Sequence, residues 1–184
     1  MTVTQFSKSF GQPSWARWDS EFPAQTYRFR DRGRFFGDAM RSGERFHCAF
    51  SQYTAGLWVP PVYYEACLSV EGALAGEKVA EIQSEVPVQG FGLAGQVDVA
   101  GTLESGRPVV AELKTTLGEY ALKPKPAEVI QLGTYATMFR HEDPLLLWLR
   151  VSLKSRCISL FKMDQSEPLL TKISGCLSCD RSAA

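Results

Sequence analysis

Three short segments in the middle of the chain alternate apolar and polar residues, and turn-forming residues separate them. They cover residues 82–88, 95–103 and 108–115. Alternation with a period of two predicts strands whose two faces differ, and consecutive strands joined by such short loops pair antiparallel. The middle of the chain is therefore expected to form a three-stranded antiparallel meander.

Helical spacing of apolar residues flanks this meander on both sides. The expected helices cover residues 31–53, a segment opened by Pro60-Pro61, and residues 127–141, and two further strands are expected at 145–151 and 156–162. Helices and strands in this order predict an α/β fold with a mixed central sheet of about five strands flanked by helices.

The length of 184 residues corresponds to one domain. We divide it into an irregular N-terminal arm at residues 1–26, a core at 27–165 and a C-terminal tail at 166–184, which looks helical at its start. The longest apolar run, residues 145–149, has the length of a strand, so no membrane-spanning segment and no membrane partner are expected.

The first ten residues lack the apolar stretch of a secretory signal, and five cysteines form an odd number without a disulfide-framework spacing. Both observations favour an intracellular, reducing compartment, cytoplasmic or organellar. The 20 Lys and Arg residues balance 20 Asp and Glu residues. Zero net charge argues against a protein that coats nucleic acid through bulk charge, and a nucleic-acid partner would have to meet a local patch.

Charged residues on two of the expected strands form a candidate site. Because side chains alternate along a strand, Glu112 and Lys114 share one face, and a hairpin can place Asp98 beside them. Two neighbouring carboxylates repel each other unless a cation lies between them, and hard divalent cations prefer oxygen ligands. The alternative interpretation is a surface salt bridge across the hairpin.

Four short motifs follow one another along the chain: Gly43-x-x-x-His47, Gly95-x-x-Asp98, Glu112-x-Lys114 and Gln131-x-x-x-Tyr135. Together and in this order they resemble the RecB-like branch of the PD-(D/E)XK nucleases. That branch includes CRISPR-associated adaptation nucleases and the mitochondrial genome-maintenance exonuclease. The resemblance covers roughly residues 40–162, and it implies a restriction-endonuclease-like core.

The resemblance also implies roles for the motif residues. Asp98, Glu112, His47 and the backbone carbonyl of Leu113 would bind Mg²⁺ or Mn²⁺. Lys114 would orient and activate the attacking water and stabilise the charge that grows on the phosphate. His47, Asp98, Glu112 and Lys114 are accordingly the expected catalytic residues.

Two residues near this set are open to two interpretations. His47 either supplies a metal ligand or is a helix histidine satisfied in the core or at the surface. Glu85 either takes the place of an extra acidic residue that some relatives hold near the metal, or is a solvated strand carboxylate.

Several residues are expected to contact nucleic acid. Gln131 and Tyr135 lie four apart, on one helical face, where the resemblance implies contacts with DNA; the alternative for Tyr135 is a place in the core. Residues 28–45 contain six arginines against three acidic residues, and aromatic residues interleave with them. That stretch could equally be a solvated helix face. The expected phosphate contacts are Lys123, Lys125, Arg34 and Arg41.

The cysteines do not match the relatives that carry an iron–sulfur cluster. Those relatives use one cysteine upstream of the core and three downstream, whereas here no cysteine precedes Cys48, although Cys157, Cys176 and Cys179 lie downstream. We expect ordinary thiols and no cluster.

The sequence thus predicts a Mg²⁺- or Mn²⁺-dependent deoxyribonuclease, more an exonuclease or end-processing enzyme of DNA repair and recombination than a site-specific endonuclease. Its partner would be DNA, single-stranded or with free ends. Two alternatives stay open: a catalytically silent member of the fold that serves as a DNA-binding or assembly subunit, and an enzyme directed at RNA.

Overall fold

The computed structural model describes residues 1–18, 23–29, 39–116, 123–139 and 143–179. Six strands form one sheet in the order β1-β6-β5-β4-β3-β2. Neighbouring strands pair antiparallel except β4 and β5, which pair parallel. The strands are β1 (Gln25–Arg28), β2 (Val79–Gly90), β3 (Leu93–Leu103), β4 (Pro108–Thr116), β5 (Leu145–Ser152) and β6 (Cys157–Met163).

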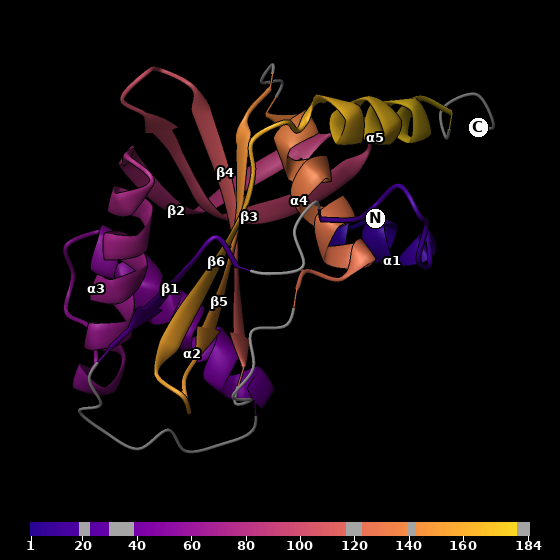
Figure 1. Cartoon of the computed structure of the whole chain (residues 1–184). Helices are drawn as coiled ribbons and strands as arrows, with labels where there is room; N and C mark the ends of the chain where they lie inside the picture. The colour runs from indigo at the N-terminus through magenta and orange to yellow at the C-terminus, as the bar shows by residue number, and fades with distance from the viewer. Residues whose placement is uncertain (19–22, 30–38, 117–122, 140–142, 180–184) are drawn as a thin grey trace.

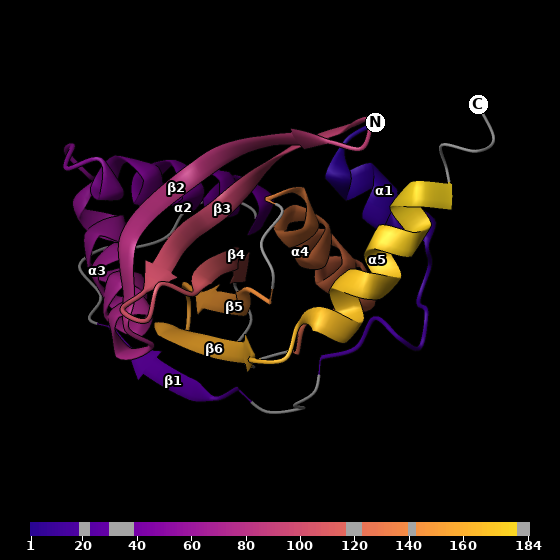
Figure 2. The same cartoon turned by 90° about the horizontal axis from the view of Figure 1, so that it is seen from above.

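Helices cover both faces of this sheet. Figures 1 and 2 show α2 and α3 against one face and α4, α1 and α5 on the other, so the molecule has three layers. The helices are α1 (Val3–Ser9), α2 (Ala39–Thr54), α3 (Pro61–Gly76), α4 (Pro126–Met138) and α5 (Glu167–Cys179). The fold is α/β with a mixed central sheet, and the meander predicted from the period-two pattern corresponds to β2, β3 and β4.

The expectation of about five strands is wrong by one, because the sheet has six. The additional strand, β1, has only four residues, and most of them are exposed, so no apolar alternation marks it in the sequence. It exists because it pairs with β6, from which about 130 residues of chain separate it. Our boundary between arm and core, at residues 26 and 27, falls inside this strand.

The N-terminal segment differs from the irregular arm that we expected. Residues Val3–Ser9 form α1, which begins with a capping box: the Thr2 side chain accepts the backbone N–H of Gln5, and the Gln5 side chain accepts that of Thr2. Val3 and Phe6 are buried against the side of the sheet that α4 covers. The Thr-x-x-Gln spacing was a helix-start signal that could have been found in the sequence.

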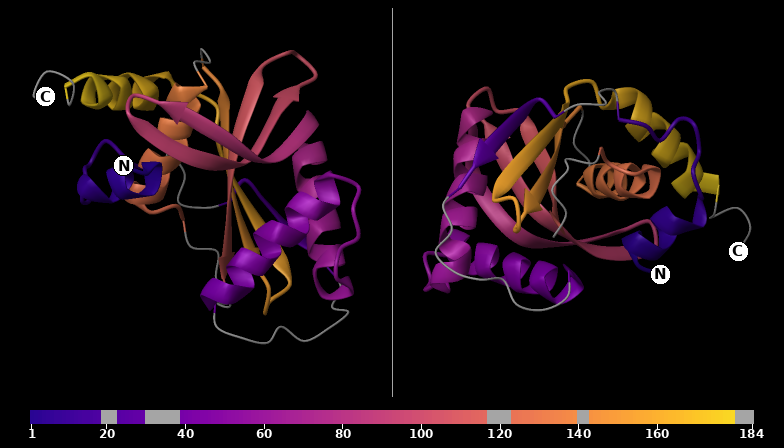
Figure 3. Two further views of the ribbon diagram at one scale, coloured as in Figure 1. Left: turned by 180° about the vertical axis from the view of Figure 1, so that it is seen from behind. Right: turned by 60° about the horizontal axis from the view of Figure 1, so that its bottom comes forward.

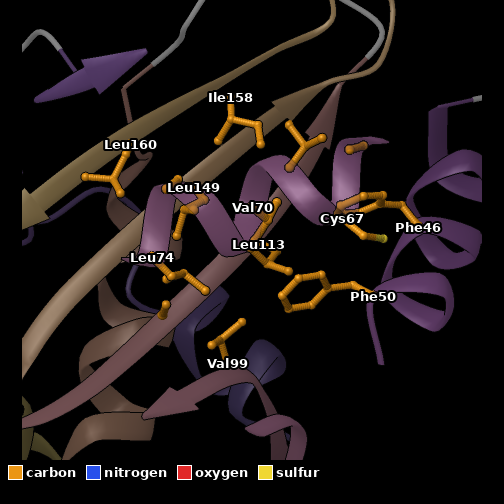
Figure 4. Close-up of a cluster of buried hydrophobic side chains, with 14 of the residues drawn as sticks. Phe46, Phe50, Cys67, Val70, Leu74, Val99, Leu113, Leu149, Ile158 and Leu160 are labelled. Carbon is orange, nitrogen blue, oxygen red and sulfur yellow. The ribbon is translucent and has the colours of Figure 1, made fainter. Parts of the chain in front are cut away.

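Two apolar clusters lie on opposite faces of the sheet. On one face, α2 and α3 pack against β4, β5 and β6, as Figure 4 shows for Phe46, Phe50, Cys67, Val70, Leu74, Val99, Leu113, Leu149, Ile158 and Leu160. On the other face, α4 and α5 cover a cluster around Trp148 and Phe161, whose rings meet edge to face. Since β5 lies between both clusters, all of its residues are buried, as expected for a strand that pairs parallel inside an α/β sheet.

The long hairpin of β2 and β3 extends beyond the rest of the sheet, as seen from behind in Figure 3. β3 pairs with β4 only from Val99 to Thr102, although a continued ladder would place Val97 opposite Leu113. Val97 and Val99 are two residues apart and would share one face of a regular strand, but they belong to opposite clusters. β3 therefore leaves β4 at Asp98, between these two valines.

Candidate active site

The point where β3 leaves β4 brings a histidine and two carboxylates together. His47 on α2 has its Nδ1 atom 3.3 Å from Oε1 of Glu85 on β2 and 3.3 Å from Oδ1 of Asp98 on β3. One ligand atom from each of the three residues lies within 4.8 Å of the others, a spacing that suits a shared metal ion. Of the two interpretations left open for Glu85, the structure favours the acidic residue beside the site.

The backbone geometry explains why Glu85 reaches this place. The β2–β3 register puts Glu85 opposite Asp98, since Ser84 pairs with Val99 and Val86 with Val97. Glu85 has a φ angle of 54°, in the left-handed region that non-glycine residues rarely adopt. Strained backbone of this kind gathers at functional sites, and here it accompanies a carboxylate that contacts His47.

Asp98 connects this group to β4. Its second oxygen, Oδ2, accepts the backbone N–H of Leu113 at 2.7 Å, and the residue is 9% exposed. This side-chain acceptor holds β4 beside β3 just beyond the last ladder pair, between Val99 and Ala111. Asp98 therefore touches both the histidine group and the strand segment that carries Glu112 and Lys114.

Glu112 and Lys114 point to the face that α4 covers. The Lys114 ammonium forms an ion pair with Oε1 of Glu112, and the same oxygen accepts a hydrogen bond from Nε2 of Gln131 at 2.9 Å. Glu112 is 1% exposed, and its other oxygen, Oε2, has no hydrogen-bond partner in the described part of the chain. A buried carboxylate oxygen without a donor is costly unless a cation or an unseen donor fills the place.

Charges within this site shift the protonation of His47. Burial lowers the pKa of its imidazole, but the hydrogen bonds to Asp98 and Glu85 and the charges of both carboxylates outweigh burial and raise the pKa to about 10. Without a metal, His47 is therefore an imidazolium between two carboxylates, where it supplies the positive charge that they require.

The pKa values of Glu112 and Lys114 are both raised. Burial, and then the charge of Asp98, raises the pKa of Glu112 to about 8, although Lys114 acts against this. Burial lowers the pKa of Lys114, but the charge of Glu112 and the hydrogen bond to it leave the pKa raised overall. The ammonium thus stays protonated, and it can donate hydrogen bonds but cannot remove a proton at neutral pH.

Two motif glycines allow close approaches that build the site. A Cβ atom on Gly43 would lie 2.6 Å from Oγ1 of Thr115, so glycine there lets α2 approach the end of β4, one turn before His47. A Cβ atom on Gly95 would lie 2.6 Å from Cε1 of Tyr135, so glycine there lets the tyrosine ring lie on β3. Both distances are below any ordinary carbon contact.

The site opens on one side to a pocket of about 850 Å³. Its lining includes Gly43, His47, Glu85, Gln96 and Lys114. Glu112 lies behind this wall, in contact with Lys114. A ligand that enters the pocket would therefore meet His47, Glu85 and the Lys114 ammonium first.

The residues expected to contact nucleic acid have different surroundings. The Tyr135 ring is buried at 3% exposure, and its hydroxyl accepts a 3.3 Å hydrogen bond from Gln131, which matches the alternative of a core tyrosine. Lys123 and Lys125 are exposed just before α4. Arg41 lies on α2 with a side chain outside the described residues, and Arg34 lies outside them altogether.

The cysteines lie in separate elements. Cys48, Cys67, Cys157 and Cys176 are free thiols on α2, α3, β6 and α5. The side chain of Cys179 lies outside the described residues. The expectation that the chain carries no iron–sulfur cluster stays a prediction.

Comparison with known proteins does not assign a family. No family model and no curated protein matches the chain. The solved structure of SSO0001 is similar at 18% sequence identity with a TM-score of 0.36, over 74% of this chain and 71% of that one. Similarity at that level carries no argument about function.

Within the described ranges, none of the helices has the length and apolar character needed to cross a bilayer.

Proposed function

We propose that this chain is a metal-dependent nuclease that hydrolyses phosphodiester bonds in DNA, with the restriction-endonuclease-like core of the RecB-like branch. The observation that carries the proposal is the double contact of Asp98. One of its oxygens faces His47, and the other accepts the N–H of Leu113, between Glu112 and Lys114. Three carboxylates, an imidazole and an ammonium thus converge from four different elements.

The residues at this site fit Mg²⁺ or Mn²⁺. His47, Glu85 and Asp98 offer one nitrogen and two carboxylate oxygens at short mutual distances. Glu112 adds the buried oxygen that lacks a donor among the described residues. Hard divalent cations prefer oxygen ligands, and an imidazole among them favours Mn²⁺. The carbonyl of Leu113 stays a predicted ligand.

A metal held here would polarise the phosphate oxygens and lower the pKa of a bound water. The chain's own residues then have distinct tasks. Lys114, kept protonated by Glu112, donates hydrogen bonds that orient the attacking water and stabilise the negative charge growing on the phosphate. Gln131 fixes the Glu112 carboxylate from α4 and so positions its free oxygen.

The proposed substrate is DNA, single-stranded or with free ends, and the proposed reaction is exonucleolytic or end-processing. The exposed Lys123 and Lys125 lie between β4 and α4 in the sequence, and Glu128 of α4 acts electrostatically on Lys114. Two ammonium groups at that position support phosphate contacts that carry no sequence information.

The test is to incubate labelled single- and double-stranded DNA, and matched RNA, with Mg²⁺, Mn²⁺ or EDTA. We expect DNA cleavage with metal only, its loss in Lys114→Ala, and wild-type rates in Lys172→Ala, which removes an exposed ammonium on α5. Cleavage of RNA alone would favour the RNA-directed enzyme. Bound but intact DNA in every metal would favour the silent subunit.

A further inference from the structure

A buried arginine lies next to Lys114 in the sheet. Arg150 on β5 occupies the register position opposite Lys114 on β4, so both side chains share the face that α4 covers. Arg150 is 8% exposed, and its guanidinium carbon lies 4.6 Å from the centre of the Trp148 ring. The Nε atom of Arg150 is buried and has no hydrogen-bond partner among the described residues.

No acidic residue in the described ranges forms an ion pair with Arg150. Burial lowers the pKa of its guanidinium, and among the described residues the charge of Glu128 acts against this. The Glu128 carboxylate, however, accepts the backbone N–H of Lys125 at 2.8 Å, as part of the cap of α4. A buried cation without a counter-charge destabilises a fold, and a second cation on the neighbouring strand adds to that cost.

The order of the strands places Arg150 on the opposite side of β4 from Asp98 and Glu85. Asp98 lies on β3, Glu112 and Lys114 lie on β4, and Arg150 lies on β5. Neighbouring strands are about 4.8 Å apart. A nucleic-acid strand that crosses the sheet would therefore bring successive phosphate groups to these side chains. An anion beside Arg150 would supply the acceptors that the described residues do not.

We propose that Arg150 binds a phosphate group of the nucleic-acid strand, next to the phosphate that Lys114 faces. The planar guanidinium, held against Trp148, presents the two parallel N–H donors that match phosphate oxygens. This inference rests on the proposed function, because it takes a nucleic acid as the substrate. Arg150 contacts a phosphate that does not react, so it contributes to binding in the ground state and the transition state alike.

The experiment measures binding of a labelled single-stranded oligonucleotide in EDTA, by fluorescence anisotropy at several salt concentrations. Arg150→Met keeps much of the side-chain volume and removes the charge. We expect its Kd to rise at least about tenfold, and the slope of log K against log salt to fall by about 0.7, the value for one phosphate contact on a single strand. Arg150→Lys keeps the charge without the two parallel N–H donors, and this variant should bind the oligonucleotide with intermediate affinity. Lys172→Gln, an exposed change on α5, should leave affinity and slope unchanged.

Thermal unfolding separates this role from a structural one. We expect the Tm of Arg150→Met to equal or exceed that of the wild type, since the change removes a buried charge that has no ion-pair partner in the described part of the chain. In steady-state cleavage with Mn²⁺, KM should rise at least about tenfold and kcat should stay within about twofold. Wild-type affinity and salt slope in Arg150→Met would overturn the proposal. So would a lowered Tm in Arg150→Met combined with wild-type affinity in Arg150→Lys.

Failure of this inference and failure of the proposed function give different results. If the wild type cleaves DNA and Arg150→Met binds and cleaves it equally well, only the role of Arg150 is lost. If the wild type binds DNA but cleaves none in any metal, the nuclease proposal is lost, and the loss of affinity in Arg150→Met in EDTA still supports the phosphate contact.

Discussion

The first and second halves of the parallel pair β4 and β5 differ in the polarity of their side chains. In the first half, three consecutive register pairs are apolar on both faces: Val109 with Leu145, Val110 with Leu146, and Ala111 with Leu147. In the second half, the face toward α2 and α3 is apolar except for Thr115, but the face toward α4 carries Glu112, Lys114 and Arg150.

This difference shows how a largely buried pair of strands can also carry the candidate site. Because β4 and β5 run in the same direction, their C-terminal ends, which carry the charged residues, lie side by side. The strand β3 leaves β4 at that same end. In open α/β sheets, ligands bind outside the carboxyl ends of the strands. The apolar half contributes stability through burial, and the charged half carries the candidate site.

The largest effect on cleavage is expected from Asp98→Asn. This change alters the charges beside the charged half of the β4–β5 pair and leaves the apolar half intact. Asparagine can still accept the N–H of Leu113, so the fold should persist, but the negative charge beside His47 is lost. Cleavage rates should fall at least about 10³-fold, roughly 4 kcal/mol of transition-state stabilisation. The measurement is kcat/KM on labelled DNA with Mn²⁺. Asp164→Asn, which changes an exposed carboxylate, is the matched control.

The converse change is Leu147→Ala in the apolar half. Leu147 is fully buried, so the cavity should lower the free energy of unfolding by about 3 kcal/mol, within the usual range of about 2–5. Denaturant unfolding measures this loss, and activity should be retained at temperatures where the variant stays folded. An unchanged unfolding midpoint would contradict the division between the two halves.

Gly95→Ala tests the close approach of Tyr135 to β3. The added methyl group must displace the tyrosine ring, so we expect a loss of about 1–2 kcal/mol in stability together with a several-fold loss of cleavage. Gly72→Ala is the control, because a Cβ atom there meets nothing within 4 Å and an alanine favours the helix α3. Equal effects of the two changes on stability would argue against a tight contact at Gly95.

The last prediction concerns pH. Folding raises the pKa of Glu112 from 4.5 to about 8 and that of His47 from 6.5 to about 10, so the folded state holds protons that the unfolded chain releases. Their contributions to stability are complete below pH 4.5 and 6.5 and are lost as pH rises to about 8 and 10, by at most roughly 1.4 kcal/mol per pH unit per proton. Urea unfolding in EDTA at pH 5.5, 7 and 9 measures this decline.

Saturating Mn²⁺ should reduce or reverse the decline, because the metal competes with these protons and binds more tightly as pH rises. His47→Gln should lessen the decline above pH 6.5 in EDTA and leave the part that Glu112 causes. A stability that increases with pH in EDTA, with or without His47, would contradict the proposed protonation of the site.

The elements that could be predicted from the sequence are those set by local patterns. The alternation around Glu112 predicted β4 and placed Glu112 and Lys114 on one face, because side-chain direction in a strand follows from position alone. The resemblance that the four motifs carry also implied that His47 and Asp98 would meet. Both predictions concern geometry, and the roles of these residues stay proposals.

The rest depends on contacts between distant parts of the chain. The strand β1 exists only through its pairing with β6, and the separation of Val97 and Val99 into two clusters depends on where β3 leaves β4. Glu85 reaches His47 through a positive φ angle that its sequence context does not indicate. Arg150 could have been noticed, since it is a charged residue directly after the longest apolar run.

The pairing of β1 with β6 has a practical consequence for shortened versions of this protein. A fragment that starts at residue 29 would lack β1, so the backbone groups of β6 that pair with β1 would have no partner strand. Most of β6 is apolar and buried. Bare apolar edges pair with other chains, so such a fragment is expected to self-associate. A shortened version should therefore keep β1, Gln25–Arg28.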